Sequence, residues 1–340
     1  MKNIYDYSLL GLEKLLLDLG ETKFRARQIY EWIYKKDVDS FSSMTNVSKL
    51  SQEKLKKEFC FTLPEVILTE KANDGTVKFL LRLGDGELIE TVLMPHDYGK
   101  SVCVSSQVGC NMGCLFCASG LIKAKRNLVP SELVGQILVA EKYLKTERVS
   151  HVVVMGIGEP FLNYENVIEF IKIINNDFGL GIGARHISVS TCGIVPMIKE
   201  FSKEPFQVNL AISLHFPFQK LREKYMPVAK TYPLEKLLEA LHEYYKETNR
   251  RITIEYLLID KVNDTEACAL ELVKILKGLD AYVNLIPINK NPYNLQRSSE
   301  EQINKFHKLL LSKKVTATIR KEFGQDIDAA CGQLKGKFKC

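Results

Sequence analysis

The stretch SVCVSSQVGCNMGCLFCA, residues 101–118, carries three cysteines on one short segment. Cys110, Cys114 and Cys117 form a C-x3-C-x2-C pattern directly after a run that is typical of a β-strand. A cubane iron–sulfur cluster is usually held by four Cys thiolates, so three on one tight loop leave one iron open to a ligand. Structural zinc favours paired C-x2-C units with a second pair or distant histidines. The pattern therefore predicts an iron–sulfur cluster, and a zinc site or a chance group of buried thiols is the alternative.

The triplet also resembles the signature of the radical S-adenosylmethionine (SAM) enzymes. In these enzymes the amino and carboxylate groups of SAM chelate the open iron of a [4Fe-4S] cluster. The resemblance implies that this chain binds both cofactors.

The composition is that of a globular protein of 340 residues, with 46% hydrophobic and 26% charged residues. This length suits one barrel-sized domain with a small appendage. No apolar run reaches the roughly 18 residues that span a bilayer, and the N-terminus mixes charges into its apolar stretch. We therefore expect a cytoplasmic protein without a membrane partner, and a monomer. The nine cysteines suggest metal or catalytic thiols, because the cytosol keeps thiols reduced.

Positive charge gathers at the C-terminal end. The net charge is +6, and residues 313–340 carry seven Lys or Arg against three Asp or Glu. A basic patch of this kind fits a phosphate-bearing partner. A solvated lysine-rich tail is the alternative.

The first 98 residues divide into two patterns. Leucines crowd residues 9–19, and Ile29, Trp32 and Ile33 recur at helical spacing, so residues 1–70 are predicted to form an all-helical accessory domain. Basic and aromatic residues are interleaved over residues 23–34, as in a helical module that contacts RNA, and an ordinary amphipathic helix is the alternative. Residues 76–95 read TVKFLLRLGDGELIETVLMP, two β-rich runs around Gly84-Asp85-Gly86. This is a strong hairpin signal, and it predicts a hairpin linker over residues 71–98.

Residues 99–340 alternate between β-rich and helical runs. After the strand at residue 101, β-rich runs recur at residues 151–156, 186–191, 208–213, 251–259, 282–289 and 315–320. Helical stretches near residues 131–146, 164–176, 234–248, 264–278 and 299–312 separate most of them. This alternation predicts an α/β fold with a parallel sheet, either open or closed into a partial (β/α)6-type barrel.

Polar and glycine-rich groups follow these strands. They are the cysteine loop, Gly156–Pro160, Thr191–Gly193, Ser213–His215 and Asn289. In α/β barrels and open sheets, ligands bind at the carboxyl ends of the strands, so one site can use all these groups. A turn, a cap or a satisfied core residue is the alternative for each group alone.

Two further cysteines are expected at the same rim. Cys331 follows the last strand, and Cys103 lies seven residues before Cys110. Two thiols directed at a SAM site suggest a covalent carrier and its resolving partner. Buried apolar cysteines are the alternative.

Motifs spread over nearly the whole chain resemble the RlmN/Cfr family of radical SAM adenine methyltransferases. They are CVSSQVGCNMGCLFCA, MGIGEP, HISVSTCGIVP, ISLH, VNLIPIN and IRKEFGQDIDAACGQL. The N-terminal FRARQIYEWIYKK and the hairpin end IETVLMP are similar to the accessory domain and linker of the branch that methylates adenine C2. The branch that methylates C8 and gives ribosomal antibiotic resistance shares the cysteines and is the alternative.

The resemblance implies a role for each matching residue. The cluster ligands would be Cys110, Cys114 and Cys117. The contacts to SAM would come from Gly158, Glu159, Ser190, Ser213, Leu214, His215 and Asn289. Cys331 would carry the methyl group, Cys103 would form a transient disulfide with it, and Glu90 would accept the ring proton. No role follows for Cys60, Cys192, Cys268 or Cys340.

The resemblance also implies the reaction and its partners. Two SAM molecules are used per turnover, one to methylate Cys331 and one to generate the 5′-deoxyadenosyl radical. The substrates would be an adenosine of 23S rRNA near the peptidyl transferase centre and the adenosine 3′ of a tRNA anticodon, with flavodoxin or ferredoxin as electron donor. A radical SAM enzyme for a small molecule or peptide, and an iron–sulfur electron carrier, remain the alternatives from other classes.

Overall fold

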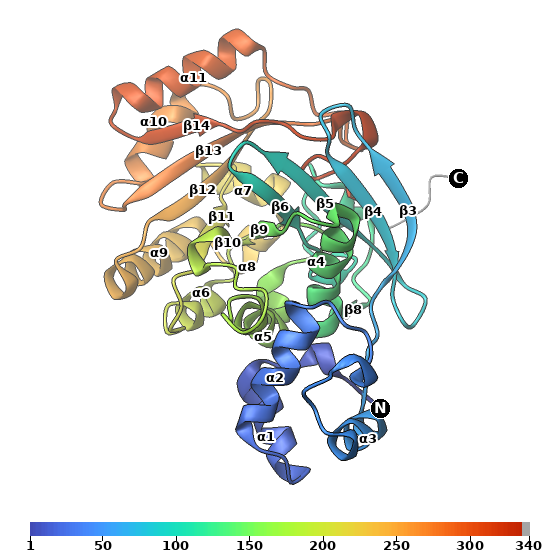
Figure 1. Cartoon of the computed structure of the whole chain (residues 1–340). Coiled ribbons are helices and arrows are strands. Elements are labelled where there is room, and N and C mark those ends of the chain that lie inside the picture. The colour runs from blue at the N-terminus through green and yellow to red at the C-terminus, as the bar shows by residue number, and fades with distance from the viewer. Residues whose placement is uncertain (335–340) are drawn as a thin grey trace.

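One ten-stranded sheet forms the centre of the computed structural model, which describes residues 1–334 (Figure 1). Its strand order is β14-β13-β12-β11-β10-β9-β6-β5-β4-β3. The strands from β14 to β6 pair in parallel, and those from β6 to β3 pair antiparallel. The parallel strands are β6 (Gly99–Cys103), β9 (Val149–Val154), β10 (Ile187–Thr191), β11 (Asn209–Ser213), β12 (Ile252–Leu258), β13 (Ala281–Pro287) and β14 (Thr316–Ile319). The predicted α/β fold is confirmed.

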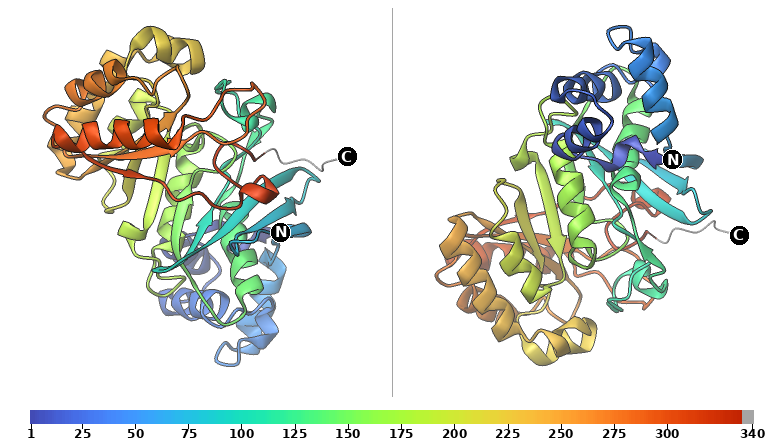
Figure 2. Two further views of the ribbon diagram at one scale, coloured as in Figure 1. Left: turned by 90° about the horizontal axis from the view of Figure 1, so that it is seen from above. Right: turned by 90° about the horizontal axis from the view of Figure 1, so that it is seen from below.

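Helices connect the parallel strands and cover the outer side of the curved sheet (Figure 2). They are α4 (Pro130–Leu144), α5 (Tyr164–Ile174), α6 (Val195–Phe201), α7 (Gln219–Tyr225), α8 (Val228–Thr231), α9 (Leu234–Thr248), α10 (Glu266–Ile275) and α11 (Glu300–Ser312). Sequence signals set their ends: α9 starts directly after Pro233 and stops at Asn249, whose φ of 49° is the left-handed conformation that terminates helices.

The two faces of the sheet differ in burial. In β9, Val152 and Val154 are buried against the helices, whereas His151 and Val153 on the opposite face are half-buried. Alternate side chains of a strand point to opposite faces. The inner face is therefore only partly covered, and this is the side that holds the site.

The hairpin region extends the sheet. β4 (Val77–Arg82) pairs antiparallel with β5 (Leu88–His96) across the predicted Gly84-Asp85-Gly86 turn. β3 (Glu65–Lys71) pairs with β4 at the sheet edge. The prediction that the helical part continues to residue 70 is wrong for this segment, because EVILTEK gains a strand partner that only the folded chain provides.

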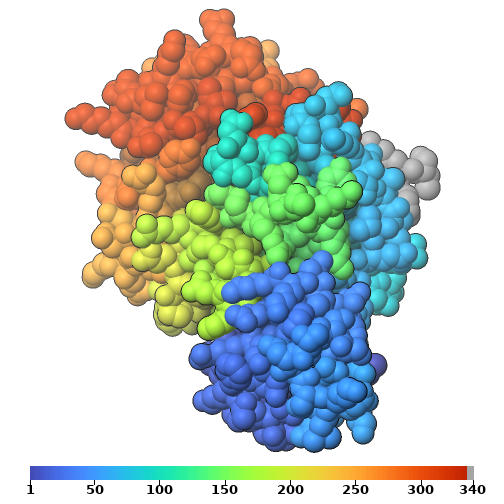
Figure 3. Space-filling model, in the orientation of Figure 1, coloured from blue at the N-terminus to red at the C-terminus, as the bar shows by residue number. Residues whose placement is uncertain are grey.

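The N-terminal helices form a lobe below the sheet (Figure 3). They are α1 (Leu9–Asp18), α2 (Lys23–Tyr34) and α3 (Lys49–Glu58), and the short strands β1 (Lys2–Asn3) and β2 (Phe59–Cys60) pair beside them. Their buried side chains belong to the same hydrophobic core as those of α4 and α5. Hydrogen bonds cross the boundary, from the Ser8 N–H to Glu169 Oε1 (2.8 Å) and from the Ser131 N–H to Asp6 Oδ1 (2.9 Å). Within residues 1–334, no helix is long and apolar enough to cross a membrane.

The segment between the lobe and β3 crosses α4 at Gly135. A Cβ atom added to Gly135 would lie 2.4 Å from Pro64 Cδ, closer than real Cβ contacts allow. Pro64 is a rigid ring and cannot swing aside as a long side chain would. Gly135 is therefore required by the close approach of the chain, although glycine is unfavourable inside a helix.

We expect Gly135→Ala to lower the free energy of unfolding. Overpacking against Pro64 costs about 1–3 kcal/mol, which outweighs the gain of about 1 kcal/mol in helix propensity. Gly11→Ala in α1 is the control: its nearest atoms are 3.5 Å away, so it should stabilise by about 0.5–1 kcal/mol. Urea unfolding measures both, and equal stabilisation by the two variants would contradict the steric role of Gly135.

Candidate active site

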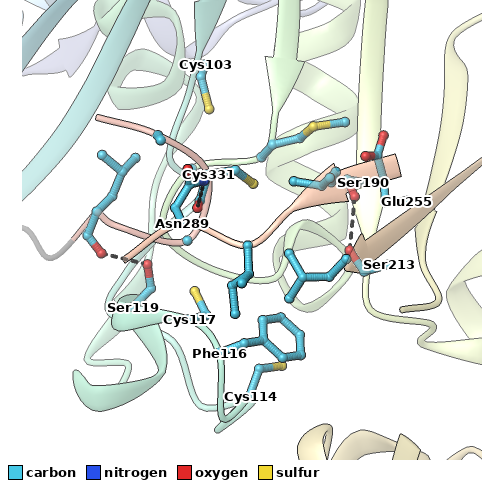
Figure 4. A pocket seen from close by; sticks show the side chains of 18 of the residues that line it. Cys103, Cys114, Phe116, Cys117, Ser119, Ser190, Ser213, Glu255, Asn289 and Cys331 are labelled. Atoms are coloured by element: carbon cyan, nitrogen blue, oxygen red, sulfur yellow. Dashed lines mark hydrogen bonds between the residues drawn. The ribbon is translucent and has the colours of Figure 1, made fainter. Parts of the chain in front are cut away.

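One pocket opens on the inner side of the sheet, at the carboxyl ends of the parallel strands (Figure 4). Eleven of the thirteen residues singled out from the sequence line it. They are Cys103, Cys110, Cys114, Cys117, Gly158, Glu159, Ser190, Ser213, His215, Asn289 and Cys331. The rim expected from the strand ends therefore exists, and it gathers groups from distant parts of the chain.

Glycines allow the cysteine loop to turn tightly. Gly109 has a φ of 79°, and a Cβ atom on it would lie 2.4 Å from Lys123 O. Only glycine fits there. The next residue, Cys110, donates its N–H to Ile122 O at 2.7 Å, which fixes the start of the triplet.

The triplet fits an iron–sulfur cluster. Cys110 and Cys114 are each 9% exposed, and burial raises the pKa of Cys110 to about 11 and raises that of Cys114 well above its ordinary value. Buried thiolates need a positive partner, which a ligated cluster supplies. In the described part of the chain no three His, Cys, Asp or Glu side chains converge to hold a single metal ion. A cubane instead takes its thiolates at separate corners, so this donor set suits the cluster.

Glu159 joins two of the strand-end loops. It is 3% exposed; Oε1 accepts the Phe161 N–H at 3.0 Å and Oε2 accepts the Cys192 N–H at 2.8 Å. Burial raises the pKa of this carboxyl, and the two N–H groups oppose the rise. The preceding Gly158 has a φ of 110°, and a Cβ atom there would lie 2.7 Å from Ser106 Oγ. The G-E pair thus lets the loop pass close to the segment that follows β6, at Ser106 and Gln107, while it presents a carboxylate to the pocket.

His215 is held as a neutral ring. Its Nδ1 accepts the Leu257 N–H at 3.1 Å, so the proton of the neutral ring lies on Nε2. Burial, followed by the charge of Arg222, lowers the pKa of His215 to about 3. A neutral imidazole with a free Nε2–H is a hydrogen-bond donor in the pocket. Ser190 and Ser213 lie nearby with their Oγ atoms 3.4 Å apart (Figure 4).

Asn289 connects the pocket to the loop that carries Cys331. Its Nδ2 donates to Cys331 O at 3.2 Å, while its buried Oδ1 has no partner in the described structure. An unpaired buried acceptor is costly. It therefore fits a ligand with an N–H or O–H group, such as SAM.

The Cys331 loop is hydrogen-bonded to the cysteine loop. The Ala118 N–H donates to Gly332 O at 2.7 Å, and Ser119 Oγ donates to Leu334 O at 2.8 Å. The sulfur of Cys331 thereby faces the same pocket as Cys103 (Figure 4). Both are free thiols.

The positive charge of Arg320 opposes the rise that burial causes in the pKa of both of these thiols. Burial, then the negative charge of Cys331, raises the pKa of Cys103 to about 12, and Arg320 opposes this rise. Cys331 reaches solvent, but the pocket walls desolvate its sulfur and raise its pKa, again opposed by Arg320. Arg320 Nη1 also lies 3.8 Å from Glu255 Oε2.

The sequence interpretation missed Arg320 and Glu255. Arg320 lies within a motif that was quoted for its cysteine, and Glu255 is a charged residue in the otherwise apolar strand ITIEYLL. A lone charge in a buried strand is the signal that could have found Glu255. No comparable signal marked Arg320.

Leu214 and Glu90 do not line the pocket. The Leu214 side chain is fully buried in the core, and its carbonyl accepts a hydrogen bond from Arg222 Nε at 3.3 Å. Glu90 lies in β5 with its carboxylate 3.6 Å from Lys78 Nζ. Val92, which lies on the same face of β5, does line the pocket. Glu90 therefore lies two residues along the strand from a residue that lines the pocket.

The other cysteines lie in different surroundings. Cys192 lines the pocket, with Sγ 3.4 Å from Met112 Sδ. Cys60 is half-buried in β2, and Cys268 is buried in α10. Cys340 lies outside the described residues.

Comparison with known proteins agrees with this geometry. Residues 104–272 match the family model of the Radical SAM superfamily, the class that uses a [4Fe-4S] cluster and SAM, and residues 2–61 match "Ribosomal RNA large subunit methyltransferase N-terminal domain". A crystal structure of a radical SAM methyltransferase from Sphaerobacter thermophilus superposes with a TM-score of 0.93 at 42% identity, covering 99% of this chain and 100% of that one.

Curated relatives define the family more closely. "Probable dual-specificity RNA methyltransferase RlmN" of Spiroplasma citri is 51% identical over 99% of this chain and 98% of its own length. The protein of the same name from Staphylococcus carnosus is 50% identical over 99% and 93%. The chain belongs to the RlmN family of radical SAM methyltransferases.

We expect His215→Gln to weaken the pH dependence of stability below pH 6.5. The pKa of His215 is about 3 in the folded state, so only the unfolded state gains a proton as the pH falls through the ordinary value near 6.5. Stability is therefore fully present above that value and declines below it, by about 1 kcal/mol between pH 6.5 and 5.5 for this residue. Urea unfolding of the cluster-free protein at both pH values measures the difference. Parallel curves for the variant and the wild type would show that His215 is not held neutral.

Proposed function

We propose that this protein methylates C2 of an adenosine in 23S rRNA and of the adenosine 3′ of the anticodon in tRNA. The observation that carries the proposal is the pair of free thiols, Cys103 and Cys331, in the pocket that also holds the cysteine triplet. A radical SAM enzyme that only cleaved SAM, or an electron carrier, would have no use for this pair. The printed names of the relatives, which state a dual-specificity RNA methyltransferase, support RNA as the substrate.

Cys331 is proposed as the methyl carrier. An sp2 ring carbon of adenine is too weak a nucleophile to take a methyl group by direct displacement, whereas a thiolate is a good one. The bound cluster and SAM would supply the methyl group and the radical that removes a hydrogen atom from it. Arg320 favours the thiolate of Cys331, and Asn289 holds the backbone of its loop.

Cys103 is proposed as the resolving thiol. It lies at the end of β6, which is held by strands on both sides, and its side chain lines the same pocket as Cys331. Burial raises the pKa of Cys103, so it stays a neutral thiol while Cys331 carries the methyl group. A Cys103–Cys331 disulfide would then form as the bond between Cys331 and the RNA breaks.

Glu90 is proposed as the acceptor of the ring proton. Its carboxylate lies 3.6 Å from the ammonium group of Lys78, which fixes its place on β5. Because Glu90 lies two residues along β5 from the pocket-lining Val92, the proposal requires that RNA binding open this side of the pocket to Glu90.

The N-terminal lobe is proposed to contact the RNA. Phe24 on α2 is 66% exposed, and Lys23, Arg25 and Arg27 surround it in sequence. Basic and aromatic side chains of this kind bind phosphates and stack on bases. A flavodoxin or ferredoxin as electron donor, a cytoplasmic location and a monomeric state complete the proposal.

We expect the two thiol variants to fail at different steps. Cys331→Ala should carry no protein methyl group, whereas Cys103→Ala should accumulate a covalent adduct between Cys331 and RNA, because no thiol remains to release it. Denaturing gels with labelled RNA and mass spectrometry of the protein measure both. Free turnover by Cys103→Ala without crosslinked RNA would refute the resolving role.

The position of methylation is tested on the nucleoside product. Methylation at C8 would use the same two thiols and is the alternative. The high identity to RlmN relatives favours C2. We expect anaerobic reaction with SAM, a reductant and unmodified rRNA or tRNA to give 2-methyladenosine after digestion, compared by mass spectrometry with both standards. Only 8-methyladenosine would overturn the C2 assignment, and neither product would overturn RNA methylation itself.

A further inference from the structure

Arg222 on α7 is a buried cation without an anionic partner. Its side chain is 0% exposed and is among the largest fully buried side chains of the protein. Nη2 donates to Cys192 O at 2.6 Å and Nε to Leu214 O at 3.3 Å, but Nη1 has no hydrogen-bond partner among residues 1–334. None of the ion pairs found in residues 1–334 includes Arg222.

Such an arrangement is unfavourable in the protein alone. A buried charge is costly unless it is paired, and arginine cannot become neutral to avoid the cost. The carboxylate of Glu159 binds the same residue, where it accepts the Cys192 N–H at 2.8 Å. The two charged groups therefore bind the N–H and the carbonyl of residue 192. The guanidinium still lacks an ion-pair partner among the described residues.

Arg222 contacts residues that pack on the cysteine loop: the Sγ atom of Cys192, whose carbonyl it binds, lies 3.4 Å from Met112 Sδ. Burial and the neighbouring thiols raise the pKa of Cys114, and Arg222 opposes them. The helix that carries Arg222 is also tied to the cysteine loop, because Tyr225 O accepts the Leu115 N–H at 2.9 Å. On the other side, a Cβ atom on Gly193 would lie 3.4 Å from Nη2, so the loop after β10 packs closely on the guanidinium.

We propose that Arg222 is the fixed counter-charge of the iron–sulfur cluster and makes the cluster easier to reduce. The proposal rests on the assignment of the cluster to Cys110, Cys114 and Cys117. A [4Fe-4S] core with three thiolates is an anion, and reduction adds one negative charge. A nearby buried cation therefore stabilises the reduced form more than the oxidised form, and it is weakly screened because water is excluded.

The test separates the charge from the hydrogen bonds. Arg222→Gln keeps amide donors without the charge, Arg222→Lys keeps the charge without the planar fork, and Arg222→Met is a second neutral variant. Lys224→Gln is the matched control, since it removes an exposed positive charge from the same helix. The midpoint potential of the reconstituted cluster is measured without RNA by anaerobic titration, with visible absorbance and EPR as readouts.

We expect the neutral variants to bind about four irons per chain. At a fixed reductant potential, their ratio of reduced to oxidised cluster should fall at least about tenfold, which corresponds to a midpoint about 59 mV lower for a one-electron couple. Arg222→Lys and Lys224→Gln should stay close to the wild type. A neutral variant with the wild-type potential would overturn the proposal, as would an equal shift in Arg222→Lys.

Two further outcomes are informative. If both neutral variants fail to fold without iron while Arg222→Lys folds, the charge serves the fold and not the cluster, and the proposal is wrong. The underlying assignment is checked separately with Cys110, Cys114 and Cys117 replaced together by Ala. If that variant keeps its iron, the cluster site itself is wrong, whereas unchanged potentials with intact iron binding reject only the role of Arg222.

Discussion

Hydrogen bonds between two loops hold the pocket together. The loop that carries Cys331 is tied to the cysteine loop through Ala118 and Ser119, although Ser119 and its partner Leu334 are 215 residues apart in the chain. Asn289 adds a third bond, from the end of β13. Because the cluster ligands and the carrier thiol share this small network, a shift of either loop changes the distance between the two chemical centres. The strands position the two loops, and these hydrogen bonds set the distance between the cluster ligands and the carrier thiol.

The arrangement of most site residues was predictable because parallel strands end at a common edge. The runs that contain Ser190 and Ser213 could be recognised as strands from their β-branched residues, and the polar group after each strand then had only one rim to occupy. The G-E pair at Gly158 and Glu159 belongs to the same case. The alternation of strands and helices, the direction of the strands and their order in the chain were enough to predict where these residues lie. Each of these features follows from local patterns in the sequence.

The remaining features depend on contacts that no local pattern encodes. The strand at Glu65–Lys71 pairs with the edge of β4, a long-range contact that the predicted helical domain of residues 1–70 did not include. Leu214 follows a strand as expected, yet its side chain turns to the core. Arg222 sits in a helix rich in charged residues, QKLREKY, and such a helix is normally solvent-exposed. Its burial follows from how α7 packs between two loops, which only the folded chain decides.

The core shared by the N-terminal lobe and the barrel has a consequence for evolution. Buried side chains of α1 and α2 pack in one cluster with those of α4 and α5. Either part alone would therefore expose these apolar side chains to solvent. The lobe cannot be exchanged between distant homologues as a module without also replacing the helix faces beneath it. Changes in the N-terminal lobe must therefore arise by stepwise substitution, and compensating substitutions must accumulate in the catalytic part of the same chain.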